Sequence, residues 1–70
     1  MTLQNAINRA RVKAARGGID WWVVEWDHQD GRAIGAVGSD DDWVDSPDFV
    51  AFDGAIIAEV TPAGYVTVYA

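Results

Sequence analysis

The chain has 70 residues and no cysteine, half of its residues are hydrophobic, and four are tryptophan. This length allows one hydrophobic core at most, and the lack of cysteine excludes disulfides and thiolate metal sites. The formal charge of −6 is unevenly distributed, because four of the five basic residues precede the first of the eleven acids. From residue 19 onward only Arg32 opposes those acids, which leaves a formal charge of −10. Such segregation predicts a charged partner or an internal dipole that the fold partly neutralises.

The N-terminal segment is predicted to form a helix that starts at the capping residue Thr2 and stops at Gly17-Gly18. One face of it is apolar and consists of Leu3, Ile7, Ala10 and Ala14. The same helix holds four cations, Arg9, Arg11, Lys13 and Arg16. Because the apolar stripe is mostly alanine, we expect the helix to lie close against a sheet. Its cations are expected to meet acids of the same fold or of a sister subunit, since the acidic remainder of the chain would repel nucleic acid.

The remainder alternates between segments typical of strands and turn signals. Strands are predicted over residues 19–27, 32–38, 55–61 and 65–69. Turns are predicted at Asp30-Gly31, Asp53-Gly54 and Pro62-Ala63-Gly64. Residues 39–48 read as an acidic connection with a short helical turn, and residues 49–52 fit either the end of that turn or a strand. The predicted fold is therefore α+β, one domain over residues 1–70, with an N-terminal helix packed on a three- to five-stranded antiparallel sheet.

Strand parity predicts which side chains share a face of the sheet. We expect the face under the helix to hold Trp22, Val24, Trp26, Ile56, Ala58, Val60, Val66 and Val68. The opposite face would hold Trp21, Val23, Glu25, Asp27, Ile57, Glu59, Tyr65, Thr67 and Tyr69. Aromatic side chains among acids would make that face a contact surface. The alternative is that residues 39–53 cover it, with Trp43 and Phe49 packing there.

The sequence has few features of a catalytic or metal site. His28 is the only histidine and has no serine or cysteine partner at a meaningful spacing. The run of acids that begins at Asp40 fails the calcium-loop pattern, which requires glycine at the sixth position and glutamate at the twelfth, where Asp45 and Ala51 stand. We therefore predict a protein that is not an enzyme and that uses no cofactor and no metal.

The opening segment Met1-Thr-Leu-Gln-Asn-Ala-Ile-Asn-Arg-Ala10 resembles the start of many short reading frames of bacteriophages. In its small size, acidity, tryptophan content and lack of cysteine, the whole chain is similar to phage-encoded inhibitors of host defence such as anti-CRISPR proteins. The resemblance implies a protein of the host bacterial cytoplasm that occludes a basic nucleic-acid channel. Acidic side chains would mimic DNA in that channel.

The predicted partner is therefore a host protein or ribonucleoprotein with a basic nucleic-acid-binding surface, without direct nucleic-acid or membrane contact. The candidate binding residues are Glu25, Asp27, Asp40, Asp41, Asp42, Trp43, Asp45, Asp48, Trp21, Tyr65 and Tyr69. Trp43 could either anchor the partner or tuck into the core and fix the loop. The second hypothesis is a small phage structural or assembly protein, or a homo-oligomeric interaction module such as a homodimer, that uses the aromatic face or the edge of the last strand. A metal-dependent enzyme is the third, and would require tight cation binding near residues 40–48.

Overall fold

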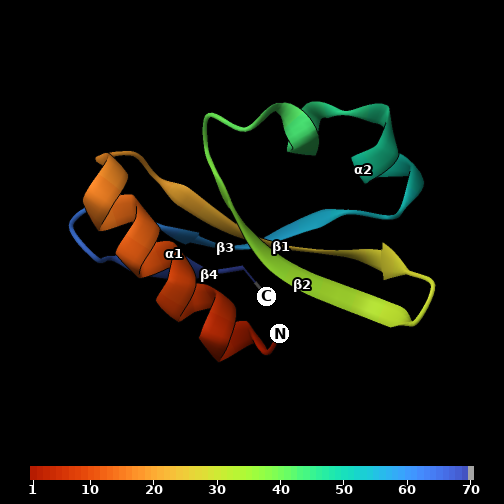
Figure 1. Ribbon diagram of the computed structural model, residues 1–70, viewed down its shortest axis with the longest axis horizontal. Helices are drawn as coiled ribbons and strands as arrows, with labels where there is room; N and C mark the ends of the chain where they lie inside the picture. The colour runs from red at the N-terminus through yellow and green to blue at the C-terminus, as the bar shows by residue number, and fades with distance from the viewer. Residues whose placement is uncertain (70) are drawn as a thin grey trace.

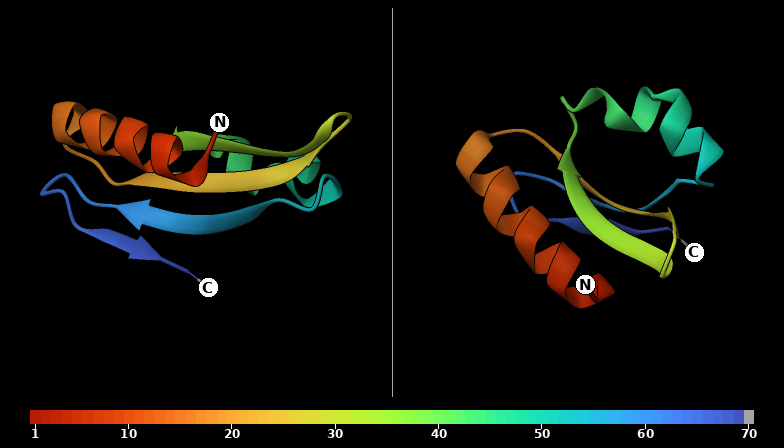
Figure 2. Two further views of the ribbon diagram at one scale, coloured as in Figure 1. Left: turned by 90° about the horizontal axis from the view of Figure 1, so that it is seen from below. Right: turned by 45° about the vertical axis from the view of Figure 1, so that its right-hand side comes forward.

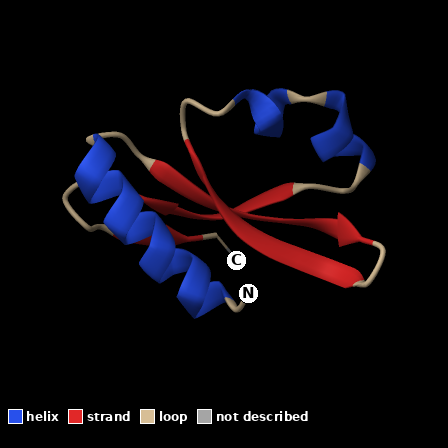
Figure 3. Cartoon of the chain, viewed as in Figure 1, coloured by secondary structure: helices blue, strands red, loops and turns tan. Residues whose placement is uncertain are grey.

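The computed structural model describes residues 1–69 and confirms the predicted α+β class. Within residues 1–69, two α-helices, one 3-10 helix and four strands follow one another (Figures 1 and 3). In order they are α1 (Leu3–Gly17), β1 (Trp21–His28), β2 (Gly31–Gly38), η1 (Asp42–Asp45), α2 (Pro47–Ala51), β3 (Ala55–Val60) and β4 (Val66–Val68). The strands form one antiparallel sheet in the order β2-β1-β3-β4. No helix in residues 1–69 combines the length and the apolar composition needed to cross a membrane.

Helix α1 begins and ends as its sequence predicts. The hydroxyl of Thr2 accepts a hydrogen bond from the Asn5 amide at 3.2 Å. At the other end Gly18 adopts a left-handed conformation (φ 68°), and its amide donates to the Ala14 carbonyl at 2.9 Å. Alanine side chains at positions 6, 10 and 14 are completely buried. These small side chains allow the close approach to the sheet that the sequence indicates.

Strands β1 and β2 form a hairpin with eight paired positions, from Trp21 opposite Gly38 to His28 opposite Gly31. Two residues, Gln29 and Asp30, make the turn, and Gly31 follows with a φ of 119° that favours glycine. A Cβ atom at Gly35 would stand only 3.2 Å from the Trp26 ring. The small residues of β2 therefore make room for a large ring, as expected.

The predicted faces of β1 are reversed in the structure. Val23 is fully buried and Trp21 half-buried in the cluster beneath α1, whereas Trp22, Val24 and Trp26 alternate onto the other face. The prediction of Ala58 and Val60 beneath the helix is confirmed.

A register shift in the sheet explains why Ile56 does not share the face of Ala58. Val23 pairs with Ala58, but the next residue, Val24, pairs with Ile56. Ile57 is therefore left over as a bulge, and it packs against the core beneath α1. The prediction that Ile56 belongs to that core is wrong, because alternation of faces does not continue through a bulge.

The last strand also lies outside the core. Figure 2 (left view) shows β4 at the edge of the sheet farthest from α1. Val66 and Val68 remain 37% and 55% exposed. The prediction that these two valines share the face under the helix is confirmed, because they pair with Val60 and Ala58. They are nevertheless not buried in the core, because the helix packs mainly on β2, β1 and β3.

A second, smaller apolar cluster occupies the opposite face. Figure 1 shows α1 and the η1–α2 segment on opposite sides of the strands, with η1–α2 toward the hairpin end. Phe49 is buried in this second layer and Val24 is completely buried on the sheet. Residues 49–52 belong to the end of α2 and the turn after it. The alternative that residues 39–53 cover the face opposite the helix is thus confirmed at this end.

Candidate partner-binding surface

The acidic segment, defined as Asp40, Asp41, Asp42, Asp45 and Asp48, lies in the loop after β2 and in η1 and α2. All five side chains are exposed. Every ion pair found among residues 1–69 is made by Arg32, so none of these five carboxylates has a cationic partner there. Their charge is open to solvent.

Local hydrogen bonds determine the backbone that presents these acids. The Asp41 carboxylate accepts from the Trp43 amide at 2.8 Å and caps η1. Ser46 caps α2 by accepting from the Phe49 amide at 3.3 Å, and its hydroxyl donates to the Trp43 carbonyl at 2.6 Å. Asp41 therefore has a structural role in addition to its charge, whereas the other four acids lack one of this kind.

Trp43 attaches the acidic segment to the sheet. Its ring meets Trp26 edge-to-face with centroids 4.9 Å apart, and Phe49 in the same manner at 5.1 Å. A Cβ atom at Gly54 would collide with the Phe49 ring, so glycine at this position is part of the close packing. The sequence left open whether Trp43 anchors a partner or packs into the core and fixes the loop. In the structure its ring packs against Trp26 and Phe49, as the second role requires.

Glu25 and Asp27, also predicted as binding residues, belong to a different group of charges. Arg32 lies opposite Asp27 in the hairpin and pairs with it at 3.0 Å, with Glu25 at 3.4 Å and with Asp53 at 3.6 Å. Desolvation lowers the pKa of Arg32, but hydrogen bonds and charges from Asp27 and Glu25 outweigh it, so the pKa is raised overall. One guanidinium thus faces three carboxylates and neutralises only part of their charge.

The predicted aromatic binding residues do not share one surface. Trp21 packs against the core beneath α1 and is not free to anchor a partner. Tyr65, in the turn between β3 and β4, is 75% exposed. Tyr69 is 46% exposed, and its hydroxyl donates to Glu59 at 2.7 Å.

Around Glu59, two further groups titrate abnormally. The pKa of Asp20 is raised because it shares a hydrogen bond with Glu59, because it is partly desolvated and because the Glu59 charge repels its own. The pKa of Tyr69 is raised by its hydrogen bond to Glu59, by desolvation and by the Glu59 charge. Sequence reasoning missed Asp20, which lies far from Glu59 in the sequence and meets it only because β1 and β3 are paired.

The four cations of α1 remain exposed. None is within ion-pair distance of an acidic side chain in the described part of the chain. The expectation that acids of the same fold neutralise them is therefore wrong for side chains of residues 1–69. Arg16 lies in the last turn, where the negative end of the helix dipole favours its charge.

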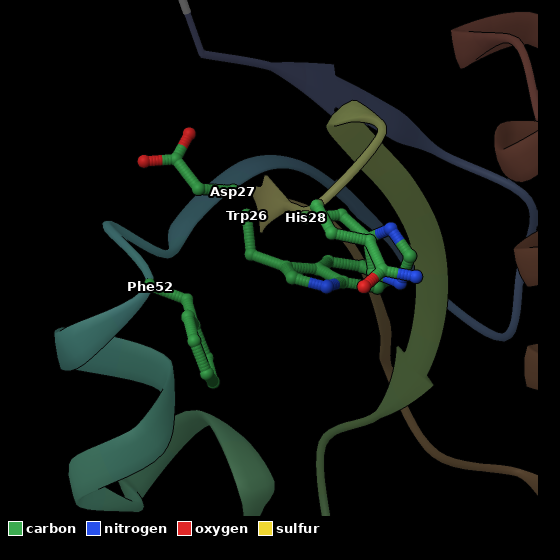
Figure 4. Close-up of a pocket in the computed structure, with 5 residues that line it drawn as sticks. Trp26, Asp27, His28 and Phe52 are labelled. Carbon is green, nitrogen blue, oxygen red and sulfur yellow. The ribbon is translucent and has the colours of Figure 1, made fainter.

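An aromatic groove of about 460 Å³ opens at the end of the sheet where β1 turns into β2. It is lined by Trp26, Asp27, His28, Gln29 and Phe52. Figure 4 shows Phe52 projecting from the turn after α2 on one side of the groove and the Trp26 ring extending from β1 on the other, while the Asp27 carboxylate points away from both rings. The Asp27 amide donates to the Phe52 carbonyl at 2.7 Å and joins the two walls.

Sequence reasoning missed this groove. It assigned Trp26 to the core beneath the helix, and Phe52 fell in the segment whose structure was ambiguous. The only sequence signal was the position of Phe52 directly before the Asp53-Gly54 turn. No group of three or more His, Cys, Asp or Glu side chains poised to hold a metal ion occurs within residues 1–69.

Comparisons of the chain with protein-family models, with curated proteins and with solved structures give no match.

Proposed function

We propose that this protein is an inhibitor that docks its acidic segment onto the basic nucleic-acid-binding surface of a host defence complex, in the manner of a DNA mimic. The observation that carries the proposal is the exposure of five carboxylates without a cationic partner in residues 1–69. Uncompensated charge of one sign speeds encounter with a surface of the opposite sign and selects against like-charged partners. The acids would occupy the positions that phosphates take in a lysine- and arginine-lined channel.

The attachment of the acidic segment supports this proposal. Caps at Asp41 and Ser46, together with the rings of Trp43 and Phe49, hold the backbone in one conformation. A segment that is ordered before binding loses less conformational entropy on binding. Five acids on a flexible tail would instead lose conformational entropy each time one of them was fixed against the partner.

The position of α1 supports it as well. The helix and its four cations lie on the side of the sheet opposite the η1–α2 segment (Figure 1). The molecule is therefore a dipole, and a basic partner surface would attract the acidic side and repel the helix. This arrangement orients the protein during encounter so that the acidic segment arrives first.

The experiment is displacement of labelled DNA from purified bacterial CRISPR and nuclease complexes, followed by fluorescence anisotropy. We expect the protein to release DNA from at least one complex, with an inhibition constant that weakens strongly between about 50 and 300 mM NaCl. Inhibition insensitive to salt, or binding only to complexes without a basic channel, would reject the proposal.

A second candidate function is assembly through the β4 edge. β4 pairs on one side only, and its valines stay exposed in the absence of a neighbour. Two copies joined edge to edge would extend the sheet and cover Val66 and Val68. Light scattering tests this second function. A dimer that dissociates in the Val68→Lys variant would support assembly through β4, whereas a monomer at all concentrations would reject it.

A further inference from the structure

The outer side of α1 carries a row of cations. The helix buries its small apolar residues against the sheet, whereas Arg9, Lys13 and Arg16 are exposed. These three, defined as the basic face, are spaced four and three residues apart and so line one side of the helix. Val12 is three residues from Arg9 and four from Arg16, which places it beside both, and it is 50% exposed. The exposed surface of α1 therefore combines positive charge with an apolar side chain.

Neither the basic face nor the acidic segment meets opposite charge within the described part of its own chain. Every ion pair among residues 1–69 involves Arg32. The two groups lie on opposite sides of the sheet (Figure 1). At physiological salt, exposed charges are screened over about 8 Å, which is less than the width of one helix. The two groups therefore cannot compensate each other across the sheet, but they can do so between two molecules.

We infer that the basic face of α1 is a docking site for the acidic segment of a second copy of this chain. A pair related by a twofold axis would have to bring both surfaces of each copy into one interface, which their positions on opposite sides of the sheet prevent. The contact is therefore head-to-tail and leaves one basic face and one acidic segment free at the ends. Further copies can add there, so the assembly grows with concentration instead of stopping at a dimer.

A second copy fits α1 better than a nucleic acid or a membrane does. It matches the helix in apolar surface as well as in charge, because Val50 is 75% exposed in α2, two residues after Asp48. A phosphate backbone would satisfy the cations but would offer little apolar surface to Val12. A membrane would require a broad apolar helix face for insertion, and α1 already buries that face against the sheet.

Docking of a second copy does not require the proposed function to hold. Both contacts would use the same acidic segment, so a second copy and a host complex would compete for it. Exposed ion pairs are individually weak. Self-association should therefore matter at high protein concentration and give way to a partner with a larger basic surface.

The first test is sedimentation equilibrium of the full chain. Protein from about 20 µM to about 2 mM is measured in about 50 mM NaCl and again in about 500 mM NaCl. We expect the weight-average mass to rise steadily with concentration at low salt, beyond that of a dimer, and to stay at the monomer value at high salt. Ion pairs exposed to solvent lose most of their attraction under the second condition.

Two triple variants locate the contact, because each lacks one half of it. The first neutralises the basic face through Arg9→Gln, Lys13→Gln and Arg16→Gln. The second neutralises part of the acidic segment and spares the cap Asp41, through Asp40→Asn, Asp42→Asn and Asp45→Asn. Each variant alone should remain monomeric at low salt. An equimolar mixture should form a 1:1 complex and stop there, and in that mixture the ¹⁵N-labelled first variant should show NMR shifts in the amides of residues 40–48.

Arg11→Gln is the matched control. It removes a cation of the same helix on the flank away from the basic face, and it should associate like the wild type. Both triple variants should keep the dispersed spectrum of the folded protein, since all six substituted positions are exposed.

Four results would overturn the inference. They are a monomer up to about 2 mM at low salt, a mixture of the two triple variants that stays monomeric, association that Val68→Lys abolishes, and binding of α1 to a short DNA duplex that the basic-face variant loses. The third would assign self-association to the β4 edge, and the fourth would assign the helix to nucleic acid. Failure here is distinct from failure of the proposed function, because a strictly monomeric protein could still displace DNA from a host complex.

Discussion

Asp20, directly before β1, and Glu59, in β3, bring two carboxyl groups together at the sheet, and the Tyr69 hydroxyl donates a hydrogen bond to Glu59 there. The folded protein holds the Asp20 proton more tightly than the unfolded chain does, because the pKa of Asp20 is raised. Folding stability from this group is therefore fully present below the ordinary pKa of 3.8 and is lost as the pH rises through the higher folded value. This residue weakens the protein at neutral pH.

Asp20→Asn should consequently raise the free energy of unfolding at pH 7. The asparagine amide can donate to Glu59 without adding a negative charge. The gain should shrink as the pH falls and disappear once Asp20 in the wild type is protonated. Urea denaturation of both proteins from pH 3 to pH 7 measures this difference.

The control is Asp30→Asn, which makes the same chemical change in the exposed hairpin turn. Its effect should not grow with pH in the same way. A constant difference between Asp20→Asn and the wild type across the whole pH range would contradict the shared hydrogen bond.

Gly54 shows how a single missing Cβ atom permits the second apolar cluster. Gly54→Ala would place a methyl group against the Phe49 ring and should destabilise the protein by about 1–3 kcal/mol. At Gly17, in the last turn of α1, the same change meets nothing closer than Ile19 Cγ1 at 3.8 Å. Gly17→Ala should be neutral or stabilising by up to about 1 kcal/mol. Equal stability of the two variants by urea denaturation would argue against this packing.

At the scale of elements, η1 and α2 depend on aromatic contacts to stay attached to the sheet. These two short helices share a capping region, and Trp43 is their link to Trp26. Helices this short are unstable without tertiary packing. Detaching them should leave the α1–sheet core intact, because Val23, Ala58 and Val60 are buried on the other face.

Trp43→Ala should lower the free energy of unfolding by about 2–3 kcal/mol. Its effect on hydrogen exchange should be confined to the η1–α2 segment. In hydrogen exchange, the amides of Ser46 and Phe52, which bond to carbonyls within the segment, should lose protection. Amides in the centre of the β1–β2 hairpin should keep theirs. Val50→Ala, at an exposed site, should alter stability by no more than about 0.5 kcal/mol. Uniform loss of protection in Trp43→Ala would contradict the local role.

The elements themselves could be predicted because they depend on local signals. Thr2 and Gly18 delimit α1, and Asp30-Gly31 marks the hairpin. The faces of β1 could not be predicted in this way. Trp21-Trp22-Val23-Val24 is apolar on both faces, so alternation does not reveal which face meets the helix, and the bulge at Ile57 is set by pairing with β1.

The candidate site could be predicted only in part, because some of its features depend on local sequence and others on how the elements pack. Exposure of the acidic segment could be predicted whatever the fold, because burying five acids within nine residues would cost too much free energy. The groove between Trp26 and Phe52 depends on how two elements dock. The pairing of Arg32 with Glu25 and Asp27 follows from cross-strand register, which the sequence left open.

At the scale of the whole molecule, the fold preserves the charge segregation of the sequence. Four cations lie on α1, and the acidic segment lies across the sheet from them (Figure 1). Within residues 1–69 only Arg32 forms ion pairs, so neither group neutralises the other. A fold stabilised by its own ion pairs would have brought them together, and this arrangement is suited to an external partner.

The most direct measurement of the docking proposal compares two variants with the same net charge in the DNA-displacement assay. One neutralises part of the acidic segment through Asp40→Asn, Asp42→Asn and Asp45→Asn, and spares the cap Asp41. The other adds three cations on exposed positions of α1 through Asn5→Lys, Asn8→Lys and Ala15→Lys. We predict that the first variant loses about tenfold or more in displacement while the second stays close to the wild type. An equal loss in both, or full activity in the first, would contradict docking through the acidic segment.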